Sequence, residues 1–247
     1  MIELLIVNHH TAAETAGLLA RLPAGFAPRV LENGSGPNDV AALAQAGCVV
    51  EVSEVNLGFA AGANRLAAGA TAPWLLFVNP DLEPDPELFA RVLARLPTDP
   101  LVAVVGGVRA GEGPRTWGRF PGLLDRFRAV EAAPEAPRAV DWVSGCFMLV
   151  RRAAFSELGG FDEGYFMQLE DVDLCWRARR RGWQVRVDPA FTFAHRGHLS
   201  YLRSRRKLAA DVRAGKVRFL SRSGRPFAAA ALRAVHAVLR LNPAAST

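Results

Sequence analysis

A pattern that repeats through the first third of the chain constrains the fold more than any other feature. A short apolar run is followed each time by a polar turn and then by an alanine-rich stretch compatible with a helix. The apolar runs are residues 4–7, 29–31 and 74–78, and the helix-compatible stretches are residues 12–21, 39–46 and 60–70. Strands that alternate with helices in this way are typical of βαβ units. We therefore expect an α/β fold in which helices flank a mostly parallel, twisted sheet.

Polar residues follow each apolar run, and their position indicates where a site would form. Asn8, Glu32 and Asn79 come directly after the three runs. In open α/β sheets, ligands bind beyond the carboxyl ends of the strands. The sequence therefore predicts a site along this edge of the sheet.

The second half of the chain predicts further elements with less regular spacing. We expect strands at residues 101–108, 140–151, 184–187 and 191–194, and helices at residues 153–158 and 170–181. The 170–181 helix begins with acids and ends with arginines before Gly182, which suits the helix dipole. Residues 110–137 are rich in Gly, Pro and Arg, which predicts a long functional loop or a short hairpin.

The positive charge of the chain is concentrated at its C-terminal end. The formal net charge is +6, and residues 201–247 alone hold 11 Lys and Arg against one acid, Asp211. We therefore expect a globular domain at residues 1–200 and a basic, mainly helical extension at residues 201–247. Two alternatives remain for this extension. It could pack on the body or on a partner subunit, as in a homodimer, or it could contact an anionic membrane through residues 203–207 and 227–241. A nucleic-acid surface is disfavoured because the charge lies in an appendage.

The cysteines and the apolar segments indicate the cellular compartment of the protein. Cys48, Cys146 and Cys175 are odd in number and form no CxxC pair, which suits a reducing cytoplasm. The first ten residues lack the basic start and the cleavage site of a signal peptide. No apolar stretch reaches the roughly 18–20 residues of a membrane span. We expect a cytoplasmic protein, with peripheral contact to the inner face of the membrane as an open alternative.

Acids and a histidine at the ends of predicted elements are the candidates for chemistry. Asp81 follows a strand, where it could simply cap a turn or could bind Mg²⁺ or Mn²⁺ shared with a diphosphate. Glu170, Asp171 and Asp173 lie within four residues at a helix start, and the helix dipole explains one or two acids there better than three. One of these acids could act as a general base. His195 follows a strand and could complete a metal site, which would favour Mn²⁺.

Residues 56–64, NLGFAAGAN, form a glycine-punctuated entry to a predicted helix. Gly58 and Gly62 allow close backbone approach, and helix N-termini favour anions. The segment matches neither a P-loop nor a GxGxxG dinucleotide motif. On its own it indicates only a loop.

Six segments, taken together and in order, resemble the family-2 glycosyltransferases, most closely the bacterial rhamnosyltransferase-like branch with its Rossmann-like GT-A fold. They are IVNHHT (6–11), LENGS (31–35), NLGFAAGAN (56–64), VNPDLEPDP (78–86), the block at 143–183 that begins VSGCFMLVRR, and HRGHLS (195–200). The resemblance implies an inverting transfer of a sugar from a dTDP- or UDP-sugar, with rhamnose as one candidate, to a hydroxyl of a glycan or a lipid-linked acceptor.

The resemblance also implies roles for individual residues. Those expected to bind the nucleoside and the donor are Asn8, Thr11, Glu32, Asn33, Ser35, Asn56, Gly58, Asn64 and Asn79. Those expected near the acceptor and the transferred sugar are Trp142, Gly145 and Glu170. Asp81 and His195 match ligands of the divalent cation, Mn²⁺ or Mg²⁺, and Asp171 matches the catalytic base. Two departures concern the nucleobase: Glu32 replaces a usual Asp, and His9-His10 replaces a usual Tyr-Asn pair.

Other function classes share some of these features. A sugar nucleotidyltransferase also combines strand-end acids, a metal and a nucleotide, but it would need a basic glycine-rich loop where Asn8, His9, His10 and Thr11 stand. A glycoside hydrolase with two carboxylates leaves the nucleotide-like first half unexplained. A nucleotide- or glycan-binding protein without catalysis would share the fold. Salt-sensitive nucleic-acid binding through the extension is a further alternative.

Overall fold

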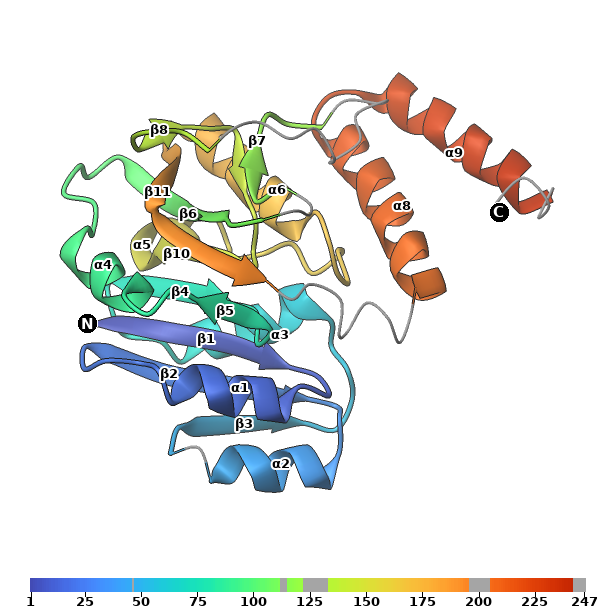
Figure 1. The fold of residues 1–247 in the computed structure, drawn as a ribbon. Helices are drawn as coiled ribbons and strands as arrows, with labels where there is room; N and C mark the ends of the chain where they lie inside the picture. The colour runs from blue at the N-terminus through green and yellow to red at the C-terminus, as the bar shows by residue number, and fades with distance from the viewer. Residues whose placement is uncertain (46, 112–114, 122–132, 196–204, 242–247) are drawn as a thin grey trace.

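The computed structural model describes residues 1–45, 47–111, 115–121, 133–195 and 205–241. Its first part contains β1 (Ile2–Asn8), α1 (Ala12–Leu19), β2 (Phe26–Asn33), α2 (Pro37–Ala44), β3 (Val49–Ser53), α3 (Phe59–Ala68) and β4 (Trp74–Val78). The four strands are parallel and lie in the order β3-β2-β1-β4 (Figure 1). The alternation of strands and helices that the sequence predicts is confirmed.

The second part extends this sheet with strands of mixed direction. It contains β5 (Leu82–Pro84), α4 (Leu88–Ala94), β6 (Val102–Arg109), β7 (Trp117–Gly118), β8 (Arg138–Ala139), β9 (Trp142–Val143), β10 (Phe147–Arg151), α5 (Arg152–Glu157), α6 (Glu170–Arg180), β11 (Gln184–His195), α8 (Arg205–Arg222) and α9 (Pro226–Leu241). The order continues β4-β10-β6-β11-β5, with β8 beside β11. Strand β10 is antiparallel to both neighbours, whereas β6 and β11 are parallel.

Two strand predictions for this part require correction, and three elements of the fold were not predicted. The single strand expected at residues 140–151 is two strands, because a turn at residues 144–146 separates β9, which pairs with β7, from β10. The two strands expected at 184–187 and 191–194 are one strand, β11, with an irregular register between Val187 and Thr192. Pro189 lies in this irregular stretch and lacks the N–H that a regular ladder needs. The predictions also missed β3, β5 and α4.

Side chains of the central strands alternate between two apolar layers, one on each face of the sheet. In β4 all five residues are buried; Leu75 and Phe77 join one layer, and Trp74, Leu76 and Val78 join the other. Helices α3, α5 and α6 cover the first layer, and α1, α2 and α4 cover the second. A sheet covered on both faces leaves its strand ends as the place where polar groups gather.

The predicted helical extension is confirmed as α8 and α9, which fold back on each other beside the sheet (Figure 1). Phe219 of α8 is fully buried and contacts the rings of Trp176 and Phe120. Helix α8 therefore packs on the body. The predicted domain boundary at residue 200 lies outside the described residues and stays a prediction.

Candidate active site

Three predicted residues meet where β4 and β11 end. Nε2 of His195 lies 3.1 Å from Oδ1 of Asp81 and 3.3 Å from Nδ2 of Asn79. The side chains of Asp81 and His195 are 12% and 15% exposed. Asp81 and His195 come from segments more than a hundred residues apart, yet the structure brings a carboxylate and an imidazole into contact at the predicted edge.

Arg109, at the end of β6, is a functional candidate that the sequence analysis missed. Its Nη2 donates to the backbone oxygen of His195 at 2.9 Å. Its buried Nε has no hydrogen-bond partner within the part of the chain that the structure describes. No motif surrounds this arginine, so only the packing of β6 against β11 could reveal it. It places a positive charge beside the Asp81–His195 pair.

The turn at residues 144–146 connects this pair with the predicted base. The backbone oxygen of Cys146 accepts a hydrogen bond from the N–H of Asn79 at 3.0 Å. One residue earlier, the N–H of Gly145 donates to Oδ2 of Asp171 at 2.9 Å. Burial raises the pKa of the Cys146 thiol to about 12, and the negative charges of both Asp171 and Asp81 add to that rise. The two carboxylates therefore both lie close to one short turn.

Asp171 lies in the first turn of α6 and its carboxylate is held by main-chain donors. Besides the bond from Gly145, its Oδ1 accepts a bond from the N–H of Val172 at 2.7 Å. Burial raises the pKa of the Asp171 carboxyl, and these hydrogen bonds oppose the rise. A fixed carboxylate with an increased proton affinity is suited to general-base catalysis.

Glu170 is the most unusual acid of the site. It is 5% exposed, and its Oε2 has no hydrogen-bond partner among the described residues. Burial raises the pKa of Glu170 well above its usual range, and the charge of Asp171 raises it further. A buried acceptor without a donor is rare in folded proteins and suggests a ligand hydroxyl as its partner.

The segment that leads into α6 has a strained backbone. Gln168 and Leu169 both have left-handed conformations, with φ of +73° and +75°. Such residues cost about 1–3 kcal/mol each and persist only where their surroundings hold them. Here Phe166 accepts a hydrogen bond from the N–H of Phe59 at the start of α3, and Gly215 of α8 packs against Gln168 and Leu169. Helices α3 and α8 therefore fix the approach to Asp171.

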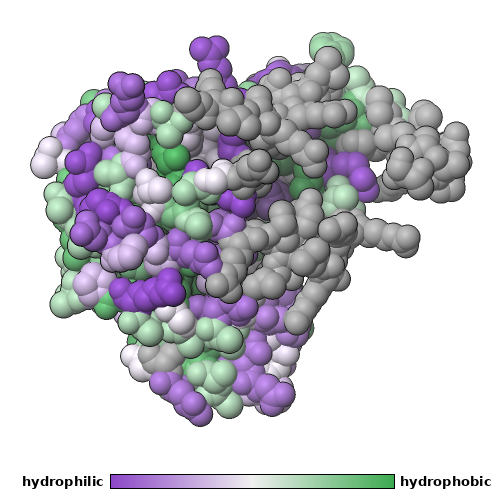
Figure 2. Space-filling view, viewed as in Figure 1, coloured by the Kyte–Doolittle hydropathy of each residue, from purple (hydrophilic) through white to green (hydrophobic). Residues whose placement is uncertain are grey.

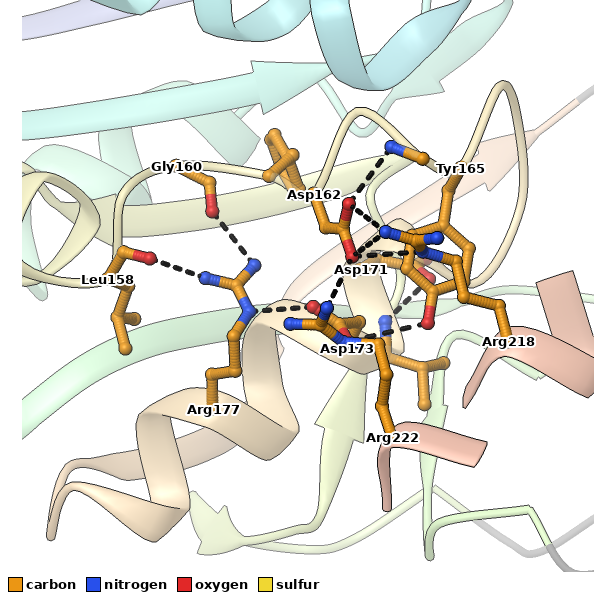
Figure 3. A network of polar contacts seen from close by, with 12 residues as sticks. Leu158, Gly160, Asp162, Tyr165, Asp171, Asp173, Arg177, Arg218 and Arg222 are labelled. Carbon is orange, nitrogen blue, oxygen red and sulfur yellow. Dashed lines mark hydrogen bonds and ion pairs between the residues drawn. The ribbon is translucent and has the colours of Figure 1, made fainter. Parts of the chain in front are cut away.

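An ion-pair network joins α6, α8 and the loop before α6 (Figure 3). Asp162 accepts hydrogen bonds from Arg218 at 2.8–3.0 Å and pairs with Arg222 at 3.2 Å. The fully buried Asp173 pairs with Arg177 at 2.6 Å and with Arg222 at 3.2 Å. Arg222 thus connects Asp162 and Asp173, which lie before and after Asp171 in the sequence. We call Asp162, Asp173, Arg177, Arg218 and Arg222 the α6–α8 network.

Several residues predicted to bind the donor are engaged with the chain itself. Asn8 is fully buried and accepts hydrogen bonds from Thr11 at 3.0 Å and Thr15 at 2.9 Å. The amide of Asn64 bonds with both the N–H and the C=O of Phe161 and with Glu163. These contacts tie Asn8, Thr11 and Asn64 to other parts of the chain, and their role in donor binding stays a prediction.

Asn33 and Asn56 shape the loop before α3 in the same manner. Asn33 donates to Asn56 at 3.1 Å and accepts from the N–H of Leu57 at 2.9 Å. Asn56 accepts from the N–H of Gly58 at 2.8 Å. Gly58 has φ of +83°, and a Cβ there would lie 2.3 Å from the backbone oxygen of Phe166, so only glycine fits.

A pocket of about 410 Å³ opens at the ends of β2 and β3. Among its lining residues are Glu32 and Ser35, two of the predicted nucleoside contacts, together with Ser53 and Glu54. The buried Glu32 accepts a hydrogen bond from the N–H of Ser35 at 2.6 Å, and the N–H of His10 donates to the Ser35 hydroxyl at 2.8 Å. The volume lies in the range of small-ligand pockets.

Trp142 is placed beneath the site rather than on its surface. It is 5% exposed and its Nε1 donates to the backbone oxygen of Arg119 at 2.8 Å. Among the described residues, no group of three or more His, Cys, Asp or Glu forms a ready metal cage. The structure thus brings together Asn79, Asp81 and His195, and it brings Asp171, with Glu170 beside it, to Gly145 of the turn at residues 144–146.

Comparison with known proteins identifies relatives of this chain. It is 34% identical over 178 residues to the N-acetylglucosaminyl-diphospho-decaprenol L-rhamnosyltransferase of Mycobacterium tuberculosis, a match that covers 58% of this chain and 57% of that protein. It is 49% identical over 59 residues to the rhamnosyltransferase WbbL of Escherichia coli, covering 24% of this chain and 22% of that protein. The chain thus spans little more than half the length of the first relative.

Solved structures confirm the GT-A fold. The mannosyltransferase PcManGT of Pyrobaculum calidifontis, in complex with GDP-Man and Mn²⁺, matches with a TM-score of 0.62 at 14% identity, over 99% of this chain and 77% of that one. Glucosyl-3-phosphoglycerate synthase of Mycobacterium tuberculosis, in complex with Mn²⁺, UDP-Glc and glycerol 3-phosphate, matches with a TM-score of 0.65 at 16% identity, over 92% and 81%. A family model described as glycosyl transferase family 2 matches residues 30–159, more than half of the chain. The protein therefore belongs to glycosyl transferase family 2.

Proposed function

We propose that this protein is an inverting, metal-assisted glycosyltransferase. It would transfer a sugar from a dTDP- or UDP-sugar, with rhamnose as the first candidate, to a hydroxyl of a lipid-linked glycan. The observation that carries the proposal is the convergence of the Asp81–His195 pair and of Asp171 on one short turn. The rhamnosyltransferase name of the first relative, which includes decaprenol, supports the choice of sugar and acceptor.

The Asp81–His195 pair fits a divalent cation. Their 3.1 Å separation is close to the roughly 3.0 Å between adjacent ligands of an octahedral ion with bonds of about 2.1 Å. A carboxylate with an imidazole favours Mn²⁺ over Mg²⁺. A bound cation would neutralise charge on the diphosphate as it leaves. Arg109 would add a second positive charge at this end of the site.

Asp171 would accept the proton of the acceptor hydroxyl. An alcohol is a weak nucleophile at neutral pH, so its proton must be removed as it attacks the sugar. The bonds from Gly145 and Val172 hold the carboxylate in place, and its raised pKa increases its proton affinity. Attack from the side opposite the diphosphate inverts the anomeric centre. Glu170, with its unpartnered Oε2, would bind a hydroxyl of the sugar or the acceptor.

The pocket at the ends of β2 and β3 would hold the nucleoside. Glu32 and Ser35 offer a carboxylate and a hydroxyl to a ribose or a base. Asn33, Asn56 and Gly58 would shape the donor loop through their mutual hydrogen bonds. Asn8, Thr11, Asn64 and Trp142 would support the site from beneath. We place the reaction in the cytoplasm, where nucleotide sugars would meet an acceptor at the membrane.

The proposal is tested by substituting Asp171. With a panel of dTDP- and UDP-sugars and Mn²⁺, we expect nucleoside diphosphate release that depends on an acceptor. Asp171→Asn should retain donor binding, measured by thermal shift, and lose about 10²- to 10⁴-fold in kcat. Asp211→Asn, on α8, is the matched control and should retain full turnover.

Three results would contradict the proposal. Near-normal turnover by Asp171→Asn would remove this residue from the role of base. Release of pyrophosphate would indicate a sugar nucleotidyltransferase. Donor binding by the wild type without turnover on any acceptor would indicate a binding protein.

A further inference from the structure

Helix α9 turns its apolar side away from the protein. Ala229 is fully buried and Arg233 donates to Ser221 of α8 at 3.3 Å, so this side of α9 faces α8. The opposite side carries Phe227, Ala230, Ala231 and Ala234, all of them exposed. An amphipathic helix of a globular protein normally buries its apolar side. The orientation of α9 is the reverse.

Phe227 is the clearest member of this outward side. It is 90% exposed, the highest value among the exposed large hydrophobic side chains of the described residues. The sequence repeats apolar residues at the same helical spacing after it, with Ala231, Ala234, Val238 and Leu241. Figure 2 shows hydrophobic residues at the surface where α9 begins. The sequence of α9 thus predicts a continuous apolar stripe along the helix. The side chains of this stripe that the structure describes are exposed.

The sequence of this end of the chain is strongly basic and lacks acids. From residue 212 to residue 247 the sequence contains no Asp or Glu and seven basic residues: Arg213, Lys216, Arg218, Arg222, Arg225, Arg233 and Arg240. Of these, Arg218 and Arg222 pair with acids of the body. By sequence, this end of the chain therefore carries a strong net positive charge.

The position of α9 is fixed by its contacts with the body. Arg225, just before the helix, donates to the backbone oxygen of Pro121 at 3.2 Å and lies over the ring of Phe219 at 6.0 Å. Figure 1 shows α8 and α9 on the side of the sheet toward which β1 and β11 point. A surface bound to α9 would therefore lie on the side of the molecule where the candidate site opens.

We propose that the outward side of α9 docks on an anionic lipid bilayer. An exposed apolar stripe within a strongly basic segment is the composition of interfacial helices, which lie in the membrane plane and bind through apolar burial and charge attraction together. A second copy of the chain is a poorer occupant, because it would place one strongly basic segment against another. Within the described residues, no helix is both long and apolar enough to cross a bilayer. Docking would bring the site to lipid-linked acceptors.

Vesicle flotation of the full chain tests the proposal without any sugar donor, so its outcome is separate from that of the glycosyltransferase assay. We expect flotation with vesicles of equal parts phosphatidylcholine and phosphatidylglycerol, and little flotation with phosphatidylcholine alone or at high salt. Phe227→Asn should lower partitioning about tenfold, the loss expected for one buried Phe side chain. Val55→Asn, at an exposed apolar residue of the body, is the matched control and should float like the wild type.

Three results would overturn the proposal. The first is failure of the wild type to float with the anionic vesicles, and the second is equal flotation of Phe227→Asn and the wild type. The third is a stable dimer in light scattering that Phe227→Asn converts to a monomer, which would assign the stripe to self-association. Circular dichroism of both variants checks the fold, and the exposure of Phe227 predicts that it is unchanged.

Discussion

Arg177 is expected to contribute far more to stability than Arg222, although both pair with Asp173. The Asp173 side chain is 0% exposed, and its partners are Arg177 at 2.6 Å, Arg222 at 3.2 Å and the Tyr165 hydroxyl at 3.3 Å. The Arg177 side chain is 15% exposed and also donates to the backbone oxygens of Leu158 and Gly160. The Arg222 side chain is 41% exposed. The same carboxylate thus has one buried and one solvated cation.

The burial of each arginine determines how much stability its removal is expected to cost. Removing one partner of a buried ion pair costs about 3–5 kcal/mol, because the remaining charge stays buried without compensation. A solvent-exposed pair contributes about 0–1 kcal/mol. Arg177→Met should therefore lower the free energy of unfolding by about 3–5 kcal/mol, and Arg222→Met by at most about 1 kcal/mol. Total stabilities of about 5–15 kcal/mol make the first change large and still measurable.

Urea unfolding followed by tryptophan fluorescence measures both variants, with Arg213→Met on the exposed side of α8 as a control. Because Asp173 lies two residues after Asp171, Arg177→Met should also lower kcat under conditions where the variant is folded. Losses of stability that agree within about 1 kcal/mol for Arg177→Met and Arg222→Met would refute the reasoning from burial. A double-mutant cycle with Asp173→Asn isolates the pairwise contribution.

Two further predictions concern glycine geometry and a buried acid. Gly58→Ala should lower the free energy of unfolding by about 1–3 kcal/mol more than Gly36→Ala. Both glycines have positive φ, but only a Cβ at residue 58 would meet a backbone atom. Equal decreases in melting temperature for the two variants would contradict this prediction. Because the folded pKa of Glu170 is raised, its ionisation destabilises the fold as pH rises above the ordinary value of about 4.3. Glu170→Gln should therefore raise the urea midpoint of unfolding at pH 8, and this increase in stability should become smaller toward pH 4. An increase that does not depend on pH would show that the effect comes from packing.

The sequence predicted the sheet-forming half of the fold because apolar runs and helix formers alternate there without interruption. It placed Asp81, Asp171 and His195 correctly at the ends of their elements, since strand-end and helix-start positions are readable from local pattern. It missed the half-exposed edge strand β3 and the short β5, whose pairing depends on neighbours distant in sequence.

The rest of the site could not be predicted because it depends on long-range packing. An Asn that binds a ligand and an Asn that joins two loops look alike in sequence, so the hydrogen bonds of Asn8 and Asn64 within the chain could not be predicted. Arg109 becomes relevant only because β6 lies beside β11. The contact between Asp162 and Arg218 joins residues 56 positions apart, and nothing local to either residue signals it.

The turn at residues 144–146 has a consequence for how such an enzyme can change its specificity. Main-chain groups of the adjacent residues Gly145 and Cys146 bind Asp171 and Asn79. The spacing between Asp171 and Asn79 is therefore set by backbone atoms, which side-chain replacement leaves in place. If the proposed function holds, the loops that bind the donor and the acceptor can diverge without changing this spacing, whereas an inserted or deleted residue in the turn would change it.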